Sequence, residues 1–316
     1  MTANLEQAAR GPDQAEDLLL QLRGITVRFG GIVALGDVSF DAKRGEVLGI
    51  IGPNGAGKTT LFDVISGVRA PNDGSVILGT DDVTKKSTAE RARRGLRRTF
   101  QRVQTFGWLS VEDNVLTALE WRGGGGGFMA DLVASPTRRK REKERRARVE
   151  EVLERCGLIP LRKELAGSLP IGVARMVEFA RAVVDPPQLL LLDEPASGLD
   201  ETETIRLGEQ IQSVRDETGC VVLLVEHNAG FVMEQSDRVV VLDLGTVLAT
   251  GLPEEIQRNQ AVRDAYLGEG DTAAEPVAAA GDPDIVVVET ETVVVETTES
   301  PTPDTTEGTT DSTTDE

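Results

Sequence analysis

The chain has 316 residues, 39% hydrophobic and 28% charged, with a formal net charge of −19. This composition is ordinary for a soluble α/β protein, and the length allows one or two domains with a sizeable core. Residues 270–316 hold 13 acidic side chains and no Lys or Arg, which leaves a net charge of −6 for residues 1–269. Nucleic acid is therefore not an expected partner, unless a local basic patch binds it.

Secretion and membrane spanning are not expected. Residues 1–17 are polar and mixed in charge, unlike a signal peptide, and no apolar run approaches the roughly 20 residues of a membrane helix. Cys156 and Cys220 lie far apart without metal-ligand spacing, which favours reduced thiols in a reducing compartment. Any membrane role is thus expected to come through a partner.

The chain begins with an expected flexible leader, residues 1–20. Three β-type segments follow, around residues 25–29, 38–40 and 47–51, separated by glycine and basic turn residues. The third is short and fully apolar, as in a buried strand.

A phosphate-binding loop follows this strand and precedes a helical segment. Its residues match G-x-x-x-x-G-K-[ST]: Gly52, Pro53, Asn54, Gly55, Ala56, Gly57, Lys58, Thr59 and Thr60. Glycines let the backbone N–H groups curl around phosphates, and the helix N-terminus adds partial positive charge. Lys58 can reach the β- and γ-phosphates, and the Thr59 hydroxyl can hold Mg²⁺. The motif predicts binding of a nucleoside triphosphate.

The middle of the chain changes character. Residues 111–121 have helical spacing, residues 123–127 are all glycine and predict a flexible loop, and residues 138–148 are dense in charge. Two interpretations of the charged segment stay open: a solvated helix face, or a surface facing a partner or anionic lipid headgroups.

Further polar residues follow predicted strands or open helices. Gln101 ends a strand, Leu169–Val173 opens a helix, and the apolar run 189–192 ends in Asp193 and Glu194. Asp193 can hold Mg²⁺ and Glu194 can deprotonate water. His227, the chain's only histidine, comes after another apolar run. Ligands bind at this edge of open α/β sheets, so we expect His227 to contact the γ-phosphate.

These elements, in this order, resemble the ATP-binding cassette of ABC transporters over residues 21–269. The matching motifs are Walker A at 52–60, the Q-loop at Gln101, the signature at 169–173, Walker B at Asp193 and Glu194, the D-loop at 197–200 and the switch histidine His227. The resemblance implies an α/β fold: a P-loop NTPase core of mostly parallel sheet with helices on both faces. It also implies an N-terminal antiparallel β-subdomain and an inserted helical subdomain at about 102–183. The tail, 270–316, lies outside the family's pattern and is expected to be disordered.

The resemblance implies site roles by motif. Phe29 would stack on adenine, residues 52–60 would bind phosphates, and Thr59, Gln101 and Asp193 would serve Mg²⁺. Glu194 would be the general base, with His227 and Gln101 beside it. Gly172 and Asp200 would act across a head-to-tail dimer of two cassettes. The signature departs from L-S-G-G-Q, since Pro170 offers neither a hydroxyl nor an N–H, and a weaker trans contact is expected.

Finer features resemble LivG-type cassettes of branched-chain or other hydrophobic amino-acid importers. They are residues 98–101, Asn114, the long insert at 121–150 and the segment 265–269. The expected partners are membrane permeases, a second cassette and, indirectly, an extracytoplasmic binding protein, with the chain peripheral on the cytoplasmic face of the membrane. An importer of urea or short amides is the alternative, followed by a soluble ABC ATPase outside transport.

Overall fold

The computed structural model describes residues 17–119 and 136–267, without the side chains of 136–139, 266 and 267. These residues belong to one compact unit that spans Met1–Asp271. The glycine run at 123–127, the first 16 residues and the acidic tail lie outside the described residues.

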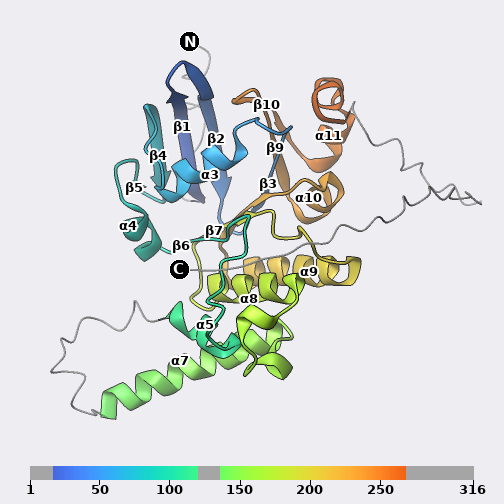
Figure 1. Ribbon diagram of the computed structural model, residues 1–316. Helices are drawn as coiled ribbons and strands as arrows, with labels where there is room; N and C mark the ends of the chain where they lie inside the picture. Colours follow the sequence, from blue (N-terminus) through green and yellow to red (C-terminus); the bar gives the residue numbers. More distant parts are fainter. Residues whose placement is uncertain (1–16, 120–135, 268–316) are drawn as a thin grey trace, which may run out of the picture. The chain divides into compact units, whose positions relative to one another are not determined.

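An antiparallel sheet forms the N-terminal part of the fold (Figure 1). Its strands, in spatial order, are β2 (Ile32–Lys43), β1 (Leu18–Phe29), β4 (Asp73–Leu78) and β5 (Asp81–Asp82). The expected leader, 1–20, is wrong at its end, because residues 18–20 are buried in β1. Their apolar side chains pack in the core, and the strand pairs with both β2 and β4.

The second sheet carries the phosphate-loop strand at its centre. Its spatial order is β10 (Thr246–Gly251), β9 (Arg238–Asp243), β3 (Val47–Ile51), β8 (Val221–Val225), β7 (Leu189–Asp193) and β6 (Leu96–Arg98). The strands from β9 to β6 are parallel, and only β10 is antiparallel to its neighbour. The expected α/β class, with a mostly parallel sheet and an antiparallel subdomain, is confirmed.

Helices cover both faces of this sheet. Leu189 and Leu191 pack in the cluster that includes α3 (Lys58–Ser66) and the antiparallel sheet, whereas Leu190 and Leu192 pack with α8 (Ile171–Val183) and α9 (Glu201–Thr218). Alternate side chains of a strand point to opposite faces, so a fully apolar run is what a doubly covered strand requires.

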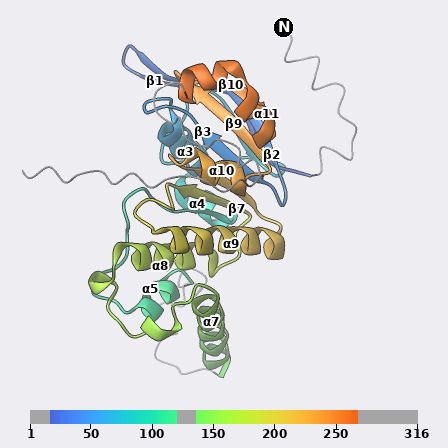
Figure 2. The same ribbon diagram turned by 90° about the vertical axis from the view of Figure 1, so that its right-hand side faces the viewer.

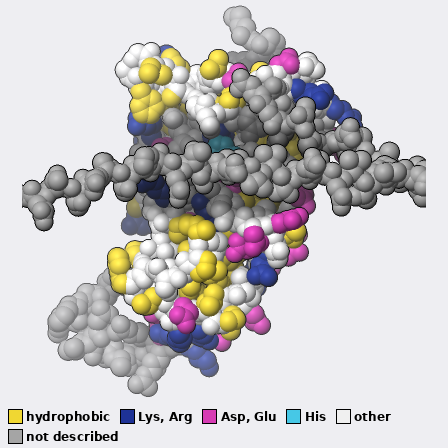
Figure 3. All heavy atoms as spheres, turned by 45° about the vertical axis from the view of Figure 1, so that its right-hand side comes forward, with side chains coloured by type: hydrophobic (Ala, Val, Ile, Leu, Met, Phe, Trp, Pro, Cys, Tyr) yellow, Lys and Arg dark blue, Asp and Glu magenta, His cyan; other side chains and the backbone are white. Residues whose placement is uncertain are grey.

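A helical region lies between β6 and β7 in the sequence and on one side of the sheet in space (Figures 1 and 2). It contains α5 (Val111–Thr117), α7 (Pro136–Arg155), the 3₁₀ turns η3 (Ile159–Leu161) and η4 (Ala166–Ser168), and α8. Val149, Val152 and Leu153 are buried on the inner side of α7. Figure 3 shows hydrophobic side chains scattered over this part of the surface, with Lys and Arg side chains below them.

The remaining helices connect or flank the sheets. They are α4 (Thr88–Arg93), α10 (Ala229–Gln235), α11 (Pro253–Arg258), α12 (Gln260–Val262) and the π-helical turn η5 (Arg263–Leu267). Within residues 17–119 and 136–267, no helix combines the length and apolar character needed to cross a bilayer.

Candidate nucleotide-binding site

Three neighbouring parallel strands end at the same edge of the sheet. β3 leads into the phosphate loop, β7 ends at Asp193, and β8 ends two residues before His227. The register pairs Asp193 with Val225 and Ile50 with Val225, so the three strand ends lie side by side. This is the edge at which open α/β sheets bind ligands.

The phosphate loop needs glycine at positions where the backbone is crowded. Gly52 has φ +156°, and a Cβ there would lie 2.1 Å from the carbonyl oxygen of Leu242. Gly57 has φ +102°, and its Cβ would lie 2.7 Å from the oxygen of Ala34. Gly57 is also the N-cap of α3 and supplies no side-chain cap. The first N–H groups of α3 therefore stay available to a ligand.

Lys58 folds back over its own loop. Its Nζ donates to the carbonyl oxygens of Gly52 at 2.5 Å and Pro53 at 3.0 Å. Burial lowers the pKa of Lys58, while the charges of Glu194 and Asp193 act in the opposite direction. A phosphate would replace the carbonyl partners with a stronger anionic acceptor. Thr59, the next residue of the helix, is exposed, and Thr60 is half-buried.

The other two predicted catalytic residues, Gln101 and His227, both contact the carboxylate of Glu194. Gln101 Nε2 donates to its two carboxylate oxygens at 3.0 and 3.2 Å, and His227 Nε2 lies 2.8 Å from Oε1. The backbone of Glu194 has φ +50°, which is uncommon for a residue with a side chain. Its N–H donates to Val225 at 2.8 Å. The three predicted residues, distant in sequence, thus form one group.

Asp193 is buried and hydrogen-bonded to Arg98 and Thr99, which lie just before Gln101 in the sequence. Burial raises the pKa of its carboxyl, and the neighbouring Arg98 guanidinium opposes that shift. Arg98 donates to Asp193 Oδ2 at 3.2 Å, and the Thr99 hydroxyl accepts the N–H of Asp193 at 3.3 Å.

Two more residues hold the segments around Glu194 and His227, and neither was assigned a role from the sequence. Arg175, on α8, donates to the carbonyl oxygens of Glu194 at 3.0 Å and Gln101 at 3.1 Å. Glu226 accepts the N–H groups of Ala196 and His227, at 2.5 and 3.1 Å, and burial raises its pKa. No local pattern marks Arg175, whereas the position of Glu226 beside His227 was a usable signal.

Phe29 ends β1 with its side chain 43% exposed. The guanidinium carbon of Arg69 lies 4.1 Å from the centre of its ring, within cation–π range. An exposed ring can accept a flat partner. No local sequence pattern indicates the contact with Arg69.

Gly172 lies at the N-terminus of α8 and Asp200 at that of α9, and Glu203 lies close to both residues. Asp200 is the N-cap of α9, where its side chain accepts the Glu203 N–H at 2.8 Å. A Cβ on Gly172 would lie 2.4 Å from a Glu203 carboxylate oxygen. In the described part of the chain, neither residue has a hydrogen bond to the phosphate loop.

The oxygen donors at the strand ends suit Mg²⁺. Asp193 Oδ1 accepts no hydrogen bond from residues 17–119 or 136–267, and the exposed Thr59 hydroxyl and the Gln101 amide add neutral oxygens. Mg²⁺ is commonly held by one or two carboxylates together with substrate phosphates and water. Among the described residues there is no cluster of three or more His, Cys, Asp or Glu for a metal held by protein alone.

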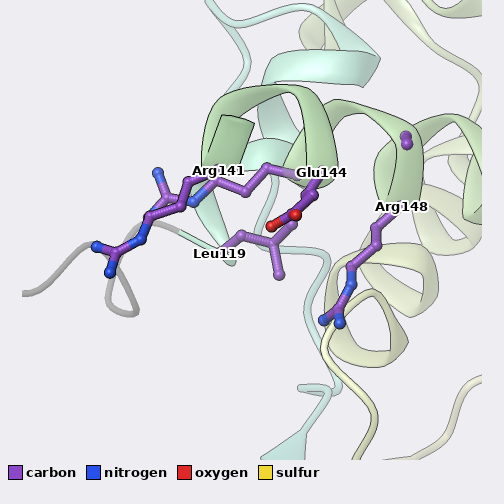
Figure 4. Close-up of a pocket in the computed structure, with 6 residues that line it drawn as sticks. Leu119, Arg141, Glu144 and Arg148 are labelled. Atoms are coloured by element: carbon purple, nitrogen blue, oxygen red, sulfur yellow. The ribbon is translucent and has the colours of Figure 1, made fainter. Parts of the chain in front are cut away.

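A separate cavity of about 410 Å³ lies on α7 (Figure 4). It is lined by Leu119, Arg141, Glu144, Arg145, Ala147 and Arg148. Lys140, Arg141, Lys143 and Arg148 are exposed, as a solvated helix face would be. The second interpretation of this segment, a contact with a partner or with lipid, stays a prediction.

The fold and the site together define a P-loop nucleoside triphosphatase with an inserted helical region. The sequence profile of the ABC transporter family matches residues 35–197, and that of the branched-chain amino acid ATP-binding cassette transporters matches residues 246–272. The chain belongs to the ABC transporter family, as its ATP-binding and ATP-hydrolysing cassette. The expected resemblance is confirmed.

Similar proteins include two annotated for branched-chain amino acid transport. The ATP-binding protein LivG of Salmonella typhimurium is 40% identical over 79% of this chain and 98% of its own length, and BraF of Pseudomonas aeruginosa is 38% identical over 79% and 98%. The lipopolysaccharide export ATP-binding protein LptB of Escherichia coli is 34% identical over 79% and 97%.

Solved structures give the same fold. A nucleotide-free ATP-binding cassette of an ABC transporter has a TM-score of 0.67 and 28% identity, over 80% of this chain and all of that one. A cassette in its ADP conformation has a TM-score of 0.67 and 28% identity, over 80% and 99%. Nucleotide is therefore the ligand of this fold.

Proposed function

We propose that this chain is the ATP-hydrolysing subunit of an importer for branched-chain or other hydrophobic amino acids. The likeness to LivG and BraF, and the match at residues 246–272, support this substrate class. LptB, which is named for a different cargo, is less similar at 34% identity. The single observation that carries the ATPase part is the convergence of Gln101 and His227 on Glu194 beside the phosphate loop.

ATP would bind with its phosphates on residues 52–60 and its adenine on Phe29. The uncapped N-terminus of α3 and the Lys58 ammonium supply the positive charge. The 43% exposed Phe29 ring supports the stacking role, since a base can lie on it. Thr59, Gln101 and Asp193 would hold Mg²⁺, which neutralises charge on the transferred phosphoryl group.

Hydrolysis would use Glu194 as the base. A water oxygen bonds to the γ-phosphorus, the bond to the ADP oxygen breaks, and the water proton passes to the Glu194 carboxylate. His227 and Gln101 hold that carboxylate in place through their ring and amide nitrogens. With its amide oxygen toward Mg²⁺, Gln101 would no longer donate its Nε2 hydrogens to Glu194. Arrival of Mg-ATP would thereby free the base for water.

The active unit would be a head-to-tail dimer with a second cassette. Gly172 lies in the first turn of α8, so its N–H can reach a phosphate held by the partner. Pro170, the N-cap of α8, lacks both hydroxyl and N–H, which makes this contact weaker than a regular signature provides. Asp200 would lie at the same interface.

Membrane permeases would be the partners that ATP-driven dimer closure moves, with this chain on the cytoplasmic face of the membrane. The cassette would begin with β1 at Leu18 and extend to about residue 269. Its helical subdomain, at about 102–183, would contact the permeases near Gln101. Partly exposed Phe106 and exposed Trp108 and Leu165 in this region offer apolar contact area. The tail, 270–316, has no assigned role.

The experiment is to purify tagged Glu194→Gln protein with ATP from solubilised host membranes and identify what accompanies it. We expect two multi-span permeases and a second cassette, since ATP that cannot be hydrolysed keeps the dimer closed. Lys58→Ala is the matched control, because it lacks the phosphate contact and should not trap the closed assembly. Recovery of soluble partners alone would contradict the transport function.

A further inference from the structure

We propose that Arg98 is a positioning residue that fixes Asp193 for Mg²⁺ and ties it to the helix of the phosphate loop. The inference rests on the proposed function, since it concerns the same Mg-nucleotide site. It gives Arg98 a role, whereas residues 98–101 served above only as a mark of resemblance.

Arg98 bridges two structural elements with one guanidinium. From the end of β6, Nη1 donates to Asp63 Oδ1 at 2.7 Å and Ser66 Oγ at 3.0 Å, both on α3. Its Nη2 donates to Asp193 Oδ2 at 3.2 Å, at the end of β7. The side chain of Arg98 is 7% exposed and that of Asp193 is 5% exposed. The contact between Arg98 and Asp193 therefore lies almost entirely out of water, whereas the Asp63 side chain at the other end is 29% exposed.

Two aromatic rings and a serine fix the orientation of the Arg98 guanidinium. The guanidinium carbon lies 5.7 Å from the ring centre of Phe62 and 5.1 Å from that of Phe100. Ser66 Oγ in turn donates to the carbonyl oxygen of Phe62 at 2.7 Å. A planar guanidinium can serve both carboxylates at once, which a single ammonium cannot do with the same geometry.

The arrangement leaves one oxygen of Asp193 for a ligand. Arg98 donates to Oδ2, and this is the hydrogen bond that the Asp193 carboxylate makes within the described part of the chain, so Oδ1 is the oxygen left for a cation. Partners that hold a metal-ligating carboxylate set its direction, and their loss commonly weakens metal binding about 10- to 100-fold. Mg²⁺ tolerates little deviation from octahedral geometry, so the direction of Oδ1 matters.

Loss of Arg98 should affect the binding of Mg²⁺ at Asp193 in two opposite ways. Removing a positive charge beside Asp193 favours Mg²⁺ electrostatically, whereas releasing the carboxylate disfavours it geometrically. Geometry dominates, because Asp193 is buried and, among residues 17–119 and 136–267, Arg98 alone donates a hydrogen bond to its carboxylate.

The test compares Arg98→Met and Arg98→Lys with Arg97→Met in the full chain. Arg97 is the neighbouring residue of β6, so its side chain leaves the sheet on the other face, where it pairs with buried Asp185 at 2.6 Å. It is a matched control for the loss of a buried arginine–aspartate pair. Arg98→Lys keeps a charge between the carboxylates and guards against failure to fold.

The readout is the affinity for a fluorescent ATP analogue, measured with Mg²⁺ and with a chelator, at each variant's folded concentration. The Mg²⁺ effect is the ratio of the affinity for the analogue with Mg²⁺ to the affinity with chelator. We expect this ratio to fall about tenfold in Arg98→Met and several-fold in Arg98→Lys. Affinity in chelator should stay within about threefold, and Arg97→Met should keep the full Mg²⁺ effect.

An undiminished or stronger Mg²⁺ effect in folded Arg98→Met or Arg98→Lys would overturn the inference alone. An equal loss of the Mg²⁺ effect in Arg97→Met would also overturn the inference, because any substitution in β6 would then have the same consequence. Absence of any Mg²⁺ effect in the unchanged protein would instead overturn the proposed metal site, and the inference with it.

Discussion

His227 Nε2 lies 2.8 Å from Glu194 Oε1, although the two residues follow different strands of the sheet. The Glu194 side chain is 12% exposed and that of His227 is 51% exposed. The Glu194 carboxylate is therefore largely enclosed, whereas the His227 imidazole is accessible. In the proposed mechanism, a bound phosphate would approach His227 beside the enclosed carboxylate.

Glu194→Gln should lower the ATP hydrolysis rate by about 100-fold or more, because an amide cannot accept the proton of water. ATP binding should remain, since the phosphate loop is untouched. Release of labelled phosphate, together with equilibrium binding of ATP, measures both quantities. A variant that hydrolyses ATP at the normal rate would show that another group is the base.

His227→Ala should lower kcat by about tenfold, because His227 Nε2 lies 2.8 Å from the Glu194 carboxylate and helps to hold it in place. Asn228→Ala is the matched control from the next position. Asn228 caps α10 by accepting the Phe231 N–H at 3.1 Å, so its loss should destabilise the fold by about 1 kcal/mol and affect kcat less. Equal losses of kcat would contradict a specific role for His227.

Glu112 links α5 to the segment after α7, and its contribution to stability should depend on pH. Hydrogen bonds from Arg162 and then Lys163 hold its pKa below the usual value. A lowered folded pKa means that the stabilisation is complete above the ordinary glutamate pKa and is lost as pH falls through the folded pKa.

Glu112→Gln should therefore cost about 1 kcal/mol at pH 7, allowing for solvent screening of the partners, and progressively less below about pH 4. Thermal unfolding of both proteins across this pH range measures the difference. A gap that stays constant or widens on acidification would contradict the ion-pair account.

Truncation after Gly270 should leave ATPase activity within about twofold, because every residue assigned to the nucleotide site precedes Gly270. Steady-state hydrolysis by the truncated and full-length chains, at equal folded concentration, measures the effect. A much less active truncated chain would assign the acidic segment a part in the site or the dimer.

The sequence predicted the site through local motifs, but not the residues that join them. Walker A, Gln101, Glu194 and His227 could be recognised because each follows a strand whose apolar run is visible. Arg98, by contrast, meets Asp193 across 95 positions, and Arg175 meets Gln101 across 74. Such pairs depend on strand order and helix packing, which no local pattern encodes.

In the antiparallel sheet, too, local sequence patterns do not indicate features that depend on tertiary packing. The start of β1 at Leu18 was missed, because Leu18–Leu20 is short and only its pairing with β2 and β4 reveals it as a strand. Similarly, Arg69 comes over the Phe29 ring from beyond α3, a contact set by tertiary packing.

The central claim is tested most directly by ATP-driven uptake of labelled leucine, isoleucine and valine into vesicles that contain the recovered assembly. We predict uptake with the unchanged chain, given its binding protein and ATP, and none with Glu194→Gln. Vigorous ATP hydrolysis without uptake of any of the three, or uptake that persists in Glu194→Gln, would contradict the account.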